Sequence, residues 1–505
     1  MAKPKISRQN WGKIYKNLPQ LDLIAIQKDS YKLFLTEVIA ELLAEVSPIE
    51  DFTGKNWELS FGRHWFAEPK HTPKEAIRKG ATLDIPLKIE AILVNKKTGK
   101  KTTSEVFLGD IPKMTETGTF IINGIERGVV NQIIRSPGVF FSGEIDRASG
   151  RMLFNAELRP LRGAWLEFFI TRNDIISVRI DRRRKFPVTT FLRALGLSTD
   201  EEILAAFTNQ QKEGRNFLLA TLEKDSTKTS QEALIEIYQK MRPGEPAVLE
   251  NASQMLTEMF FNYRRYNFGK VGRFKLNKRL NLKFSNTKEN WVLKKNDVVE
   301  TVKYLIKLQN GQGEVDDIDH LANRRLRQVG ELVAESAFRV GLLRLERSIK
   351  EKMSLVSTEE KVTPAQLVNA RPLIAAVNEF FRSNQLSTVL DQTNPLSELD
   401  NLRRVSVMGP GGITRERASF SIRDINASQY GRICPVRSPE GPNIGLVTYL
   451  ALYARVNEFG FLETPYREVK KVGSRMKVTN EIVYLTADDE QEHFITYAGV
   501  NIDKN

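Results

Sequence analysis

Residues 118–141 have the sequence GTFIINGIERGVVNQIIRSPGVFF. The pair Asn123-Gly124 stands between two runs of β-favouring residues, which is the strongest short-range signal for a β-hairpin with a two-residue turn. The pattern places Arg127 on the returning strand. This stretch therefore predicts antiparallel β structure.

On either side of this hairpin in the sequence, the spacing of apolar residues changes. Apolar residues from Leu21 to Leu43 recur at intervals of three and four, which predicts an amphipathic helix. From about 135 to 185, turn residues at 148–150 and 172–174 separate short β-favouring runs and predict more hairpins. Residues 200–241 are rich in helix formers and predict two or three helices closed by Arg242-Pro243-Gly244. The fold class expected is α+β, in several domains.

A long helix is predicted to run from about residue 329 to Lys352. Its expected buried face consists of Val329, Leu332, Val333, Val340 and Leu343. Its expected solvent-exposed face consists of Glu331, Glu335, Arg339, Arg344 and Arg347. A second helical region covers 364–382. Beyond it, the glycines and prolines between 409 and 442 favour ordered loops.

Composition limits the possible classes of protein. The 505 residues predict about three to four domains at roughly 100 to 200 residues each. A net charge of +14 favours polyanionic partners, namely nucleic acid, phosphorylated ligands or anionic lipid. The single cysteine, Cys434, excludes an intrachain disulfide and a cysteine-based zinc site. Without a signal-peptide pattern or an apolar run near ~18 residues, we expect a soluble cytoplasmic protein.

The common signatures of self-contained enzymes are missing from the sequence. It has no Walker loop, dinucleotide fingerprint, nucleophile elbow or His-Glu-x-x-His. Its four histidines are far apart, so a shared metal site is not expected. The glycines of 409–412 could cradle a phosphate, but no Lys-Ser/Thr follows, and a structural turn is favoured.

Two basic clusters point toward nucleic acid. Residues 263–279 carry seven basic and no acidic residues, interleaved with Tyr263, Tyr266, Phe268 and Phe274. Such a mixture neutralises phosphates and offers ring faces to bases. Residues 179–185 form the second cluster. A solvated basic face is the alternative for either cluster alone, and the two together on a +14 chain favour nucleic acid.

One cluster is acidic, with Asp316, Asp317 and Asp319 beside His320. Three carboxylates could hold Mg²⁺. A helix N-terminus over 321–325 is the favoured alternative, because aspartates there accept free backbone N–H groups.

Several long segments carry a family resemblance: 118–141, 179–187 (RIDRRRKFP), 263–280, 317–330 (DIDHLANRRLRQVG), 384–422 and 430–467. They closely resemble the N-terminal part of the β subunits of bacterial multisubunit DNA-directed RNA polymerases. The resemblance covers nearly the whole chain and is thinnest at about 185–250 and 280–315.

The resemblance implies a domain organisation. Residues 1–134 and 328–400 resemble the protrusion, 135–327 the lobe inserted into it, and 401–505 the start of the fork, incomplete at its C-terminus. Together these domains form one jaw of a cleft that holds downstream DNA, the transcription bubble and the RNA–DNA hybrid. Because family members continue further, we expect either a truncated chain or a split subunit that a second polypeptide completes.

The resemblance also implies nucleic-acid contacts. Seven residues match a pocket for an unpaired non-template base: Arg135, Trp165, Ile318, Asp319, Arg324, Ile413 and Ile422. An indole can stack on a base, and an acid–arginine pair can recognise a base edge. This assignment turns the acidic cluster into a DNA contact. In the basic cluster 179–185, Arg182 and Arg183 are the residues expected to bind nucleic acid.

Residues 409–428 resemble the fork loop, where downstream duplex separates. Arg415 and Arg417 of this loop are expected to contact backbone phosphates. Glu440, in the stretch 439–445 near the hybrid, is expected to position neighbouring cations and not to bind metal.

Six residues match the rifamycin pocket on the path of the nascent RNA: Arg127, Asp391, Ser397, Asn401, Arg404 and Ser406. The sequence departs from the family here, because Thr388, Val389 and Asn401 replace the common Gln, Phe and His. Loss of larger polar and aromatic partners predicts reduced rifamycin sensitivity. Arg437-Ser438 replaces a usual Glu-Thr and reverses a charge near the hybrid, for which the sequence offers no physical account.

The family's nucleotidyl transfer uses two Mg²⁺ ions, one held by an aspartate triad of the β′ subunit. That triad is not in this sequence, so we assign the chain no catalytic residue, metal ligand or cofactor. The implied activity is RNA synthesis from ribonucleoside triphosphates with release of diphosphate, by an assembly in which this chain alone is inactive. Expected partners are β′, α and sigma subunits, the remainder of β, both DNA strands and nascent RNA, without a membrane.

A different class stays open at this stage, namely a free-standing basic protein that binds nucleic acid for architecture or regulation. Co-purification with β′ and α polypeptides would favour the subunit, and a stable monomer that binds DNA alone would favour this alternative.

Overall fold

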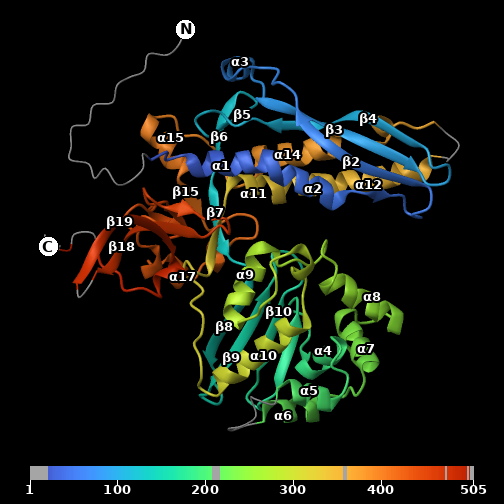
Figure 1. The fold of residues 1–505 in the computed structure, drawn as a ribbon, viewed down its shortest axis with the longest axis vertical. Helices are drawn as coiled ribbons and strands as arrows, with labels where there is room; N and C mark the ends of the chain where they lie inside the picture. The colour runs from blue at the N-terminus through green and yellow to red at the C-terminus, as the bar shows by residue number, and fades with distance from the viewer. Residues whose placement is uncertain (1–20, 208–215, 357–360, 473–474, 498–499, 501–505) are drawn as a thin grey trace. The chain divides into compact units, whose positions relative to one another are not determined.

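The computed structural model describes residues 21–207, 216–356, 361–472, 475–497 and 500. The chain folds into two compact units. Residues 135–324 form the inserted unit, and segments 1–134 and 325–505 together form the discontinuous unit. Both units combine helices with largely antiparallel sheets (Figure 1), which confirms the predicted α+β class. In the described part of the chain, no helix is long and apolar enough to cross a membrane.

The largest sheet of the discontinuous unit is antiparallel and four-stranded. Every second residue of its third strand is buried, from Ile85 to Leu93, because one face of the strand packs on the core. The strands, in order, are β1 (Ile49–Glu50), β2 (Trp57–Phe66), β3 (Asp84–Asn95) and β4 (Lys101–Pro112).

Helices from both segments of the discontinuous unit, 25–46 and 329–383, cover this sheet and share its core (Figure 1). Two of them, α12 and α14, approach closely at Gly341, where an added Cβ would lie 2.6 Å from the Leu373 side chain. Up to residue 390, the α-helices of the discontinuous unit are α1 (Ala25–Leu33), α2 (Ile39–Val46), α3 (Pro73–Lys79), α11 (Val329–Val333), α12 (Arg339–Leu355), α13 (Pro364–Leu367) and α14 (Arg371–Ser383).

The long helix predicted to reach Lys352 is present, but its expected buried face is wrong beyond residue 333. Leu343 is 45% exposed, and Arg339, expected on the wet side, is mostly buried and pairs with Glu45 at 2.8 Å. A π-helical turn at Ala334–Phe338 is the cause, because it inserts an extra residue and rotates the following face. A similar turn, Phe34–Val38, joins α1 to α2, so the predicted N-terminal helix is confirmed with one irregular turn.

The hairpin predicted around Asn123-Gly124 is confirmed. Asn123 has φ +51° and Gly124 φ +77°, as a type I′ turn requires. At Gly124 an added Cβ would lie 2.7 Å from the Gly80 Cα, so the turn also needs the missing side chain. The three strands of this sheet are β14 (Ser387–Val389), β6 (Ile125–Val129) and β5 (Phe120–Ile122).

A third sheet joins distant parts of the sequence in the order β13-β7-β15-β16. Strand β15 runs parallel to β7 and antiparallel to β16. Its strands are β13 (Arg324–Arg327), β7 (Asn131–Arg135), β15 (Arg404–Ser406) and β16 (Val447–Tyr449), with α15 (Pro395–Leu402) immediately before β15.

Between β15 and β16 the chain forms ordered loops, as predicted, and α16 (Phe420–Arg423) is a single short helix within them. The last sheet of this unit is antiparallel and contains β17 (Arg455–Val456), β18 (Leu462–Val472) and β19 (Arg475–Thr486), followed by α17 (Ala487–Glu490).

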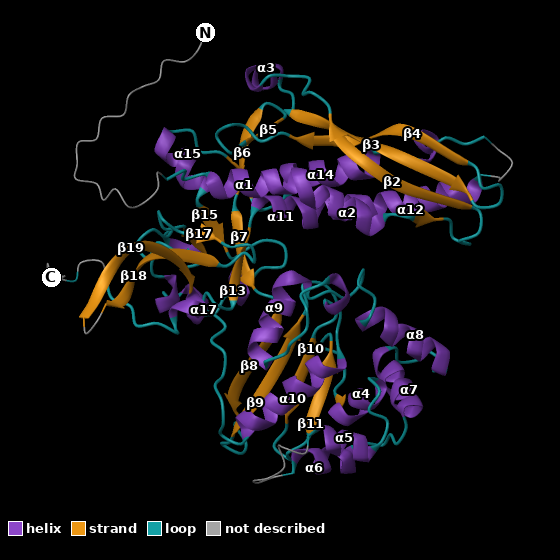
Figure 2. Cartoon of the chain, viewed as in Figure 1, coloured by secondary structure: helices purple, strands orange, loops and turns teal. Residues whose placement is uncertain are grey.

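The inserted unit is built on an antiparallel five-stranded sheet, which confirms the predicted hairpins between 135 and 185. The strands, in spatial order, are β12 (Phe186–Pro187), β11 (Ile176–Ile180), β10 (Leu166–Ile170), β9 (Met152–Arg159) and β8 (Gly138–Ile145). Figure 2 shows α9 and α10 lying across these strands. The helices are α4 (Val188–Ala194), α5 (Asp200–Ala206), α6 (Phe217–Lys224), α7 (Ser230–Met241), α8 (Leu249–Phe260), α9 (Gly269–Leu280) and α10 (Lys295–Gln309), and α5 to α7 confirm the helices predicted for 200–241.

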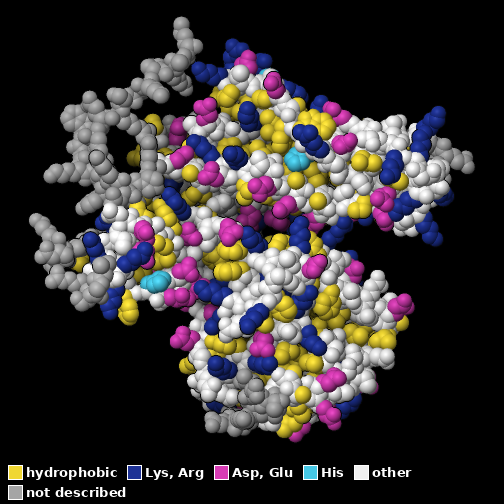
Figure 3. Space-filling model, in the orientation of Figure 1, with side chains coloured by type: hydrophobic (Ala, Val, Ile, Leu, Met, Phe, Trp, Pro, Cys, Tyr) yellow, Lys and Arg dark blue, Asp and Glu magenta, His cyan; other side chains and the backbone are white. Residues whose placement is uncertain are grey.

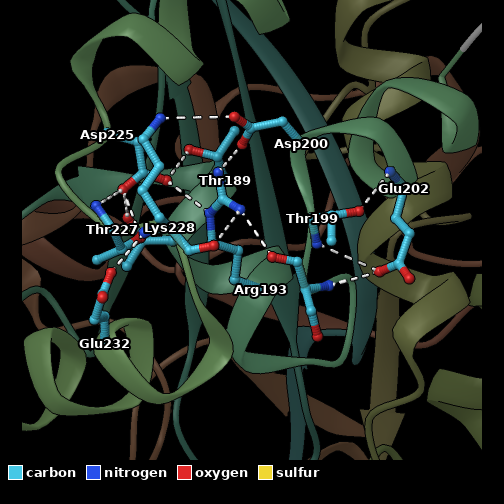
Figure 4. A network of polar contacts seen from close by, with 11 residues as sticks. Thr189, Arg193, Thr199, Asp200, Glu202, Asp225, Thr227, Lys228 and Glu232 are labelled. Carbon is cyan, nitrogen blue, oxygen red and sulfur yellow. Dashed lines mark hydrogen bonds and ion pairs between the residues drawn. The ribbon is translucent and has the colours of Figure 1, made fainter.

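A buried polar network joins α4, α5 and the loop before α7 (Figure 4). The Arg193 side chain is fully buried and donates to the Ser198 carbonyl oxygen at 2.9 Å. Its Nε lies 3.6 Å from a carboxylate oxygen of Asp225, which also accepts from the Thr189 hydroxyl at 2.5 Å. Buried charges need such partners, so this network fixes how the helices of the unit pack.

Candidate nucleic-acid interface

Trp165 is the centre of a charged cluster on the inserted unit. It lies just before β10, where its backbone N–H donates to Asp181 at 2.8 Å. The guanidinium carbon of Arg159 lies 4.3 Å from the centre of the indole ring, and that of Arg182 lies 5.5 Å from it. Two cations thus lie close to the half-buried indole, and positive charge beside an aromatic ring suits a stacked, negatively charged nucleotide.

Glu157 links Arg159, which lies beside the indole ring, to Arg135. Its carboxylate pairs with Arg159 at 2.7 Å and with Arg135 at 3.7 Å. Sequence reasoning missed Glu157 and Arg159. They stand two apart on β9, so they share a face, but their sequence context does not distinguish them from ordinary strand residues.

Asp319 lies near both remaining arginines of the predicted pocket. Burial, then the charge of Arg159, lowers the pKa of Arg135 to about 10, and Glu157 and Asp319 oppose this shift. Burial also lowers the pKa of Arg324, against the opposing charges of Asp319 and Asp317. The structure therefore brings Arg135, Trp165, Asp319 and Arg324 into one cluster.

Of the three aliphatic residues expected in the pocket, Ile318 is half-buried in the same turn as Asp319. Ile413 and Ile422 belong to the discontinuous unit. Ile422 packs there against the small core of Met408, Leu446 and Val447, which gives it a structural role of its own.

The helix predicted to follow the acidic cluster is wrong. Residues 317–323 form turns that lead directly into β13. Asp316 accepts the Phe141 N–H at 2.8 Å, Asp317 accepts the Asp319 N–H at 2.9 Å, and the Asn323 amide donates to the Asp317 carbonyl at 2.7 Å. These bonds satisfy the backbone without a helix. Among the described residues, no group of three or more His, Cys, Asp or Glu is placed to hold a metal ion.

The basic cluster 263–279 is divided between surface and core: Arg264, Arg265, Lys270 and Lys278 are exposed, but two of its four rings are buried, so the expectation that these rings face bases is wrong. Tyr266 and Phe268 are fully buried in the core of the unit. Arg273 is also fully buried and forms a two-pronged ion pair with Asp297, at 2.6 and 2.9 Å. The sequence pattern missed this partner because it lies 24 residues further on.

The basic cluster 179–185 is, by contrast, mostly at the surface. Residues 181–185 are exposed, and Asp181 and Arg182 both have positive φ, as in a tight turn. Arg183 donates to the Met241 carbonyl oxygen, so part of its hydrogen-bonding capacity serves the fold. Arg182 approaches the Trp165 ring, which joins this turn to the indole cluster.

On the face shown in Figure 3, Lys and Arg side chains are interspersed with Asp and Glu. The surplus of positive charge therefore does not by itself mark a binding face there. Local geometry such as the indole cluster is the better guide.

In the discontinuous unit, the loop after β15 carries exposed cations. Arg415 and Arg417 lie in a short 3₁₀ turn and are exposed, as is Glu440. The glycine-rich stretch 409–412 is a turn in which the Gly412 N–H donates to the Gly409 carbonyl oxygen at 2.9 Å. The Gln132 amide also holds it, by donating to the Met408 and Pro410 carbonyl oxygens, each at 3.1 Å. At Gly412 an added Cβ would lie 2.2 Å from the Val407 oxygen, so this glycine is needed for the turn itself.

The six residues predicted to line the rifamycin pocket lie on β6, α15, β15 and the segment between β14 and α15. Arg127 donates to the Ser387 carbonyl at 3.2 Å. Hydrogen bonds from Thr393, with help from the charge of Arg404, lower the pKa of Asp391. Asn401 is buried on α15 and bonds to the Ser397 carbonyl at 3.3 Å, and Ser406 accepts the Met408 N–H at 3.1 Å.

Three family models match the chain. "RNA polymerase Rpb2, domain 2" matches residues 135–327, "RNA polymerase Rpb2, domain 3" matches 388–456, and "RNA polymerase beta subunit external 1 domain" matches 466–505.

Curated relatives match almost the full chain. The DNA-directed RNA polymerase subunit beta of Syntrophomonas wolfei is 48% identical over 502 residues, covering 99% of this chain and 44% of the relative. The proteins of the same name from Gloeobacter violaceus and Trichormus variabilis are each 49% identical over 96% of this chain and 42% of their own length. The chain thus spans less than half the length of these relatives.

Proposed function

The chain belongs to the family of DNA-directed RNA polymerase β subunits, and we propose that it serves as the N-terminal portion of such a subunit in DNA-templated RNA synthesis. Its part is to hold nucleic acid: downstream DNA, the transcription bubble and the RNA–DNA hybrid. The family matches support this role over that of a free-standing DNA-binding protein.

The observation that carries the proposal is the indole cluster on the inserted unit. Arg135, Trp165, Asp319 and Arg324 come from three separate segments and meet in one place, joined by Glu157 and Arg159. We assign it to an unpaired non-template base, with Ile318 beside it. Arg182 and Arg183 would contact the neighbouring backbone. Stacking supplies most of the affinity, and the acid–arginine pair supplies selectivity.

The discontinuous unit would contribute a second set of contacts. Arg415 and Arg417 are exposed cations for backbone phosphates, and Glu440 positions cations near the hybrid. Arg127, Asp391, Ser397, Asn401, Arg404 and Ser406 would line the rifamycin pocket along the RNA path.

Catalysis is proposed to come from the assembly and not from this chain alone. The β′ subunit would hold the Mg²⁺ ions that activate the RNA 3′ hydroxyl and stabilise the departing diphosphate. Further partners would be α and sigma subunits and the remainder of β. Because the template is cytoplasmic in bacteria, we propose the cytoplasm as the site of action.

The test is reconstitution. Mixtures of β′, α, sigma and the remainder of β are assayed for promoter-dependent RNA synthesis with and without this chain. We expect synthesis only in its presence, and a chain that binds DNA but neither joins the assembly nor restores synthesis would contradict the proposal.

Rifamycin gives a second, independent measurement on the same assembly. Val389 is 58% exposed on β14 and Thr388 lies beside it, so neither presents the ring or long amide that the family commonly has. We expect weak inhibition, and a nanomolar inhibition constant would contradict it.

A further inference from the structure

The pair Arg437-Ser438 occupies a defined place in the discontinuous unit. Arg437 donates to the Asp400 carboxylate on α15 at 2.9 Å, and its guanidinium carbon lies 4.8 Å from the centre of the Tyr449 ring on β16. Arg404 approaches the same ring at 5.8 Å. Arg437 therefore connects its loop both to α15 and to the sheet that carries Arg404.

The loop that Arg437 anchors, residues 434–445, is closed by its own hydrogen bonds. Arg437 donates its N–H to the Cys434 sulfur at 3.4 Å, and Gly445 donates to the Ser438 hydroxyl at 3.2 Å. Arg423 donates to the carbonyl oxygens of Pro442 and Ile444, each at 2.9 Å. The loop is thus a preformed unit that can be held or shifted as a whole.

The charges of positions 400 and 437 are matched. A glutamate at 437 would face the Asp400 carboxylate across a distance at which like charges repel. Arginine at 437 turns this repulsion into an ion pair. The side chain of Asp400 is 29% exposed and that of Arg437 is 58% exposed. Because solvent screens such a pair, it contributes little to the stability of the fold.

We propose that Arg437 is a positioning residue that fixes the loop 434–445, and with it Glu440, to the α15 helix through Asp400. This deepens the proposed function and rests on it, because it links two of the surfaces assigned to the RNA–DNA hybrid and the RNA path. The link acts through the geometry of the loop and not through direct contact of Arg437 with nucleic acid.

The main experiment is a charge-reversal cycle in the assembled polymerase. R437E, D400K and the double variant R437E/D400K are compared in the dissociation half-life of a stalled elongation complex. Each single reversal should shorten the half-life about fivefold, the scale on which a half-exposed ion pair becomes a like-charge pair. The double variant and the conservative R437K should stay within about twofold of the parent.

The matched control is R347E, which reverses an exposed arginine paired with Glu351 at 3.1 Å on α12. It should leave the half-life unchanged. If both single reversals are defective and the double variant does not recover, Arg437 acts directly on nucleic acid, and the proposal is overturned. An unchanged half-life in R437E overturns it as well.

A second measurement does not depend on RNA synthesis. Cys434 is the only cysteine of the chain, so its rate of labelling by a thiol reagent in the purified full chain reports on the loop. D400N should raise this rate about threefold or more, and E351Q should not. If the parent assembly makes no RNA, the proposed function fails while the labelling still decides this inference, and an unchanged rate in D400N refutes it.

Discussion

The two basic clusters of the inserted unit, 263–279 and 179–185, look alike in composition, but only the first sends a cation and two aromatic rings into the core. The first places Arg273, Tyr266 and Phe268 fully inside the core. The second exposes residues 181–185 and brings Arg182 against the Trp165 ring. An arginine becomes structural where the fold supplies a buried carboxylate, and it is available to a ligand where the fold supplies only solvent and an aromatic face.

The largest test of this contrast is to remove the carboxylate that holds Arg273. Asp297→Ala leaves a fully buried guanidinium without its ion-pair partner, which costs about 3–5 kcal/mol of unfolding free energy. Urea unfolding followed by circular dichroism measures the change. The matched control is Glu351→Ala, which breaks an exposed pair and should cost no more than about 0.5 kcal/mol. Equal losses of unfolding free energy in both variants would contradict the expected difference between buried and exposed arginine ion pairs.

The second test concerns the ligand side of the contrast. Trp165→Ala should weaken binding of single-stranded DNA by about 1–3 kcal/mol, because it removes the aromatic ring that lies beside Arg159 and Arg182 and can stack on a base. Fluorescence anisotropy of a labelled oligonucleotide measures the affinity, with unfolding checked in parallel. Undiminished binding by a folded variant would show that the indole is not a base platform.

The third test uses pH at the edge of the buried cluster, where Arg279 pairs with Asp316 at 3.1 Å. Burial raises the pKa of Asp316 above its usual value, although Arg279 opposes this. A raised pKa in the folded state gives stability that is full below about pH 3.8 and is lost as pH rises through the folded pKa.

The stability of the parent chain relative to Asp316→Asn should therefore fall as pH rises from about 3.8 through the pKa of the folded state, by about 1.4 kcal/mol for each pH unit by which the two pKa values differ. Unfolding curves at several pH values measure this difference. A difference that rises with pH would show that the ion pair outweighs burial.

The smallest expected effect is that of Arg182→Ala. An exposed arginine contributes little to the fold, so stability should change by less than about 0.5 kcal/mol. The slope of DNA affinity against salt should fall by about 1, as for loss of one phosphate contact. Arg172→Ala, an exposed arginine at the other end of β10, is the matched control and should leave the slope unchanged.

Much of the secondary structure could be predicted from local pattern alone. The Asn123-Gly124 turn and the helices of 200–241 depend on interactions between close neighbours in sequence, which the residues themselves specify. The buried face of α12 could not be predicted in this way, because one inserted residue in the turn 334–338 rotates everything after it. The helix prediction next to the acidic cluster is wrong for a related reason, because the aspartates of 316–323 bond to Phe141 and to one another.

The candidate site likewise contains residues that the sequence indicated and residues that only the structure revealed. Family resemblance pointed to Arg135, Trp165, Asp319 and Arg324, whereas Glu157 and Arg159 emerged only from the packing of β9 beside β10. The role of Arg437 likewise depends on Asp400, 37 residues earlier in the chain.

The sequence by itself determined the class of protein, the positive charge, the hairpins and most helices, because these follow from composition and from neighbours a few residues apart. Only the tertiary structure decided which arginines are buried, which carboxylate each of them meets, and which side chains surround Trp165. The reason is physical: desolvation and ion pairing depend on distances in space, and no local pattern of residues encodes the distance between segments far apart in the chain.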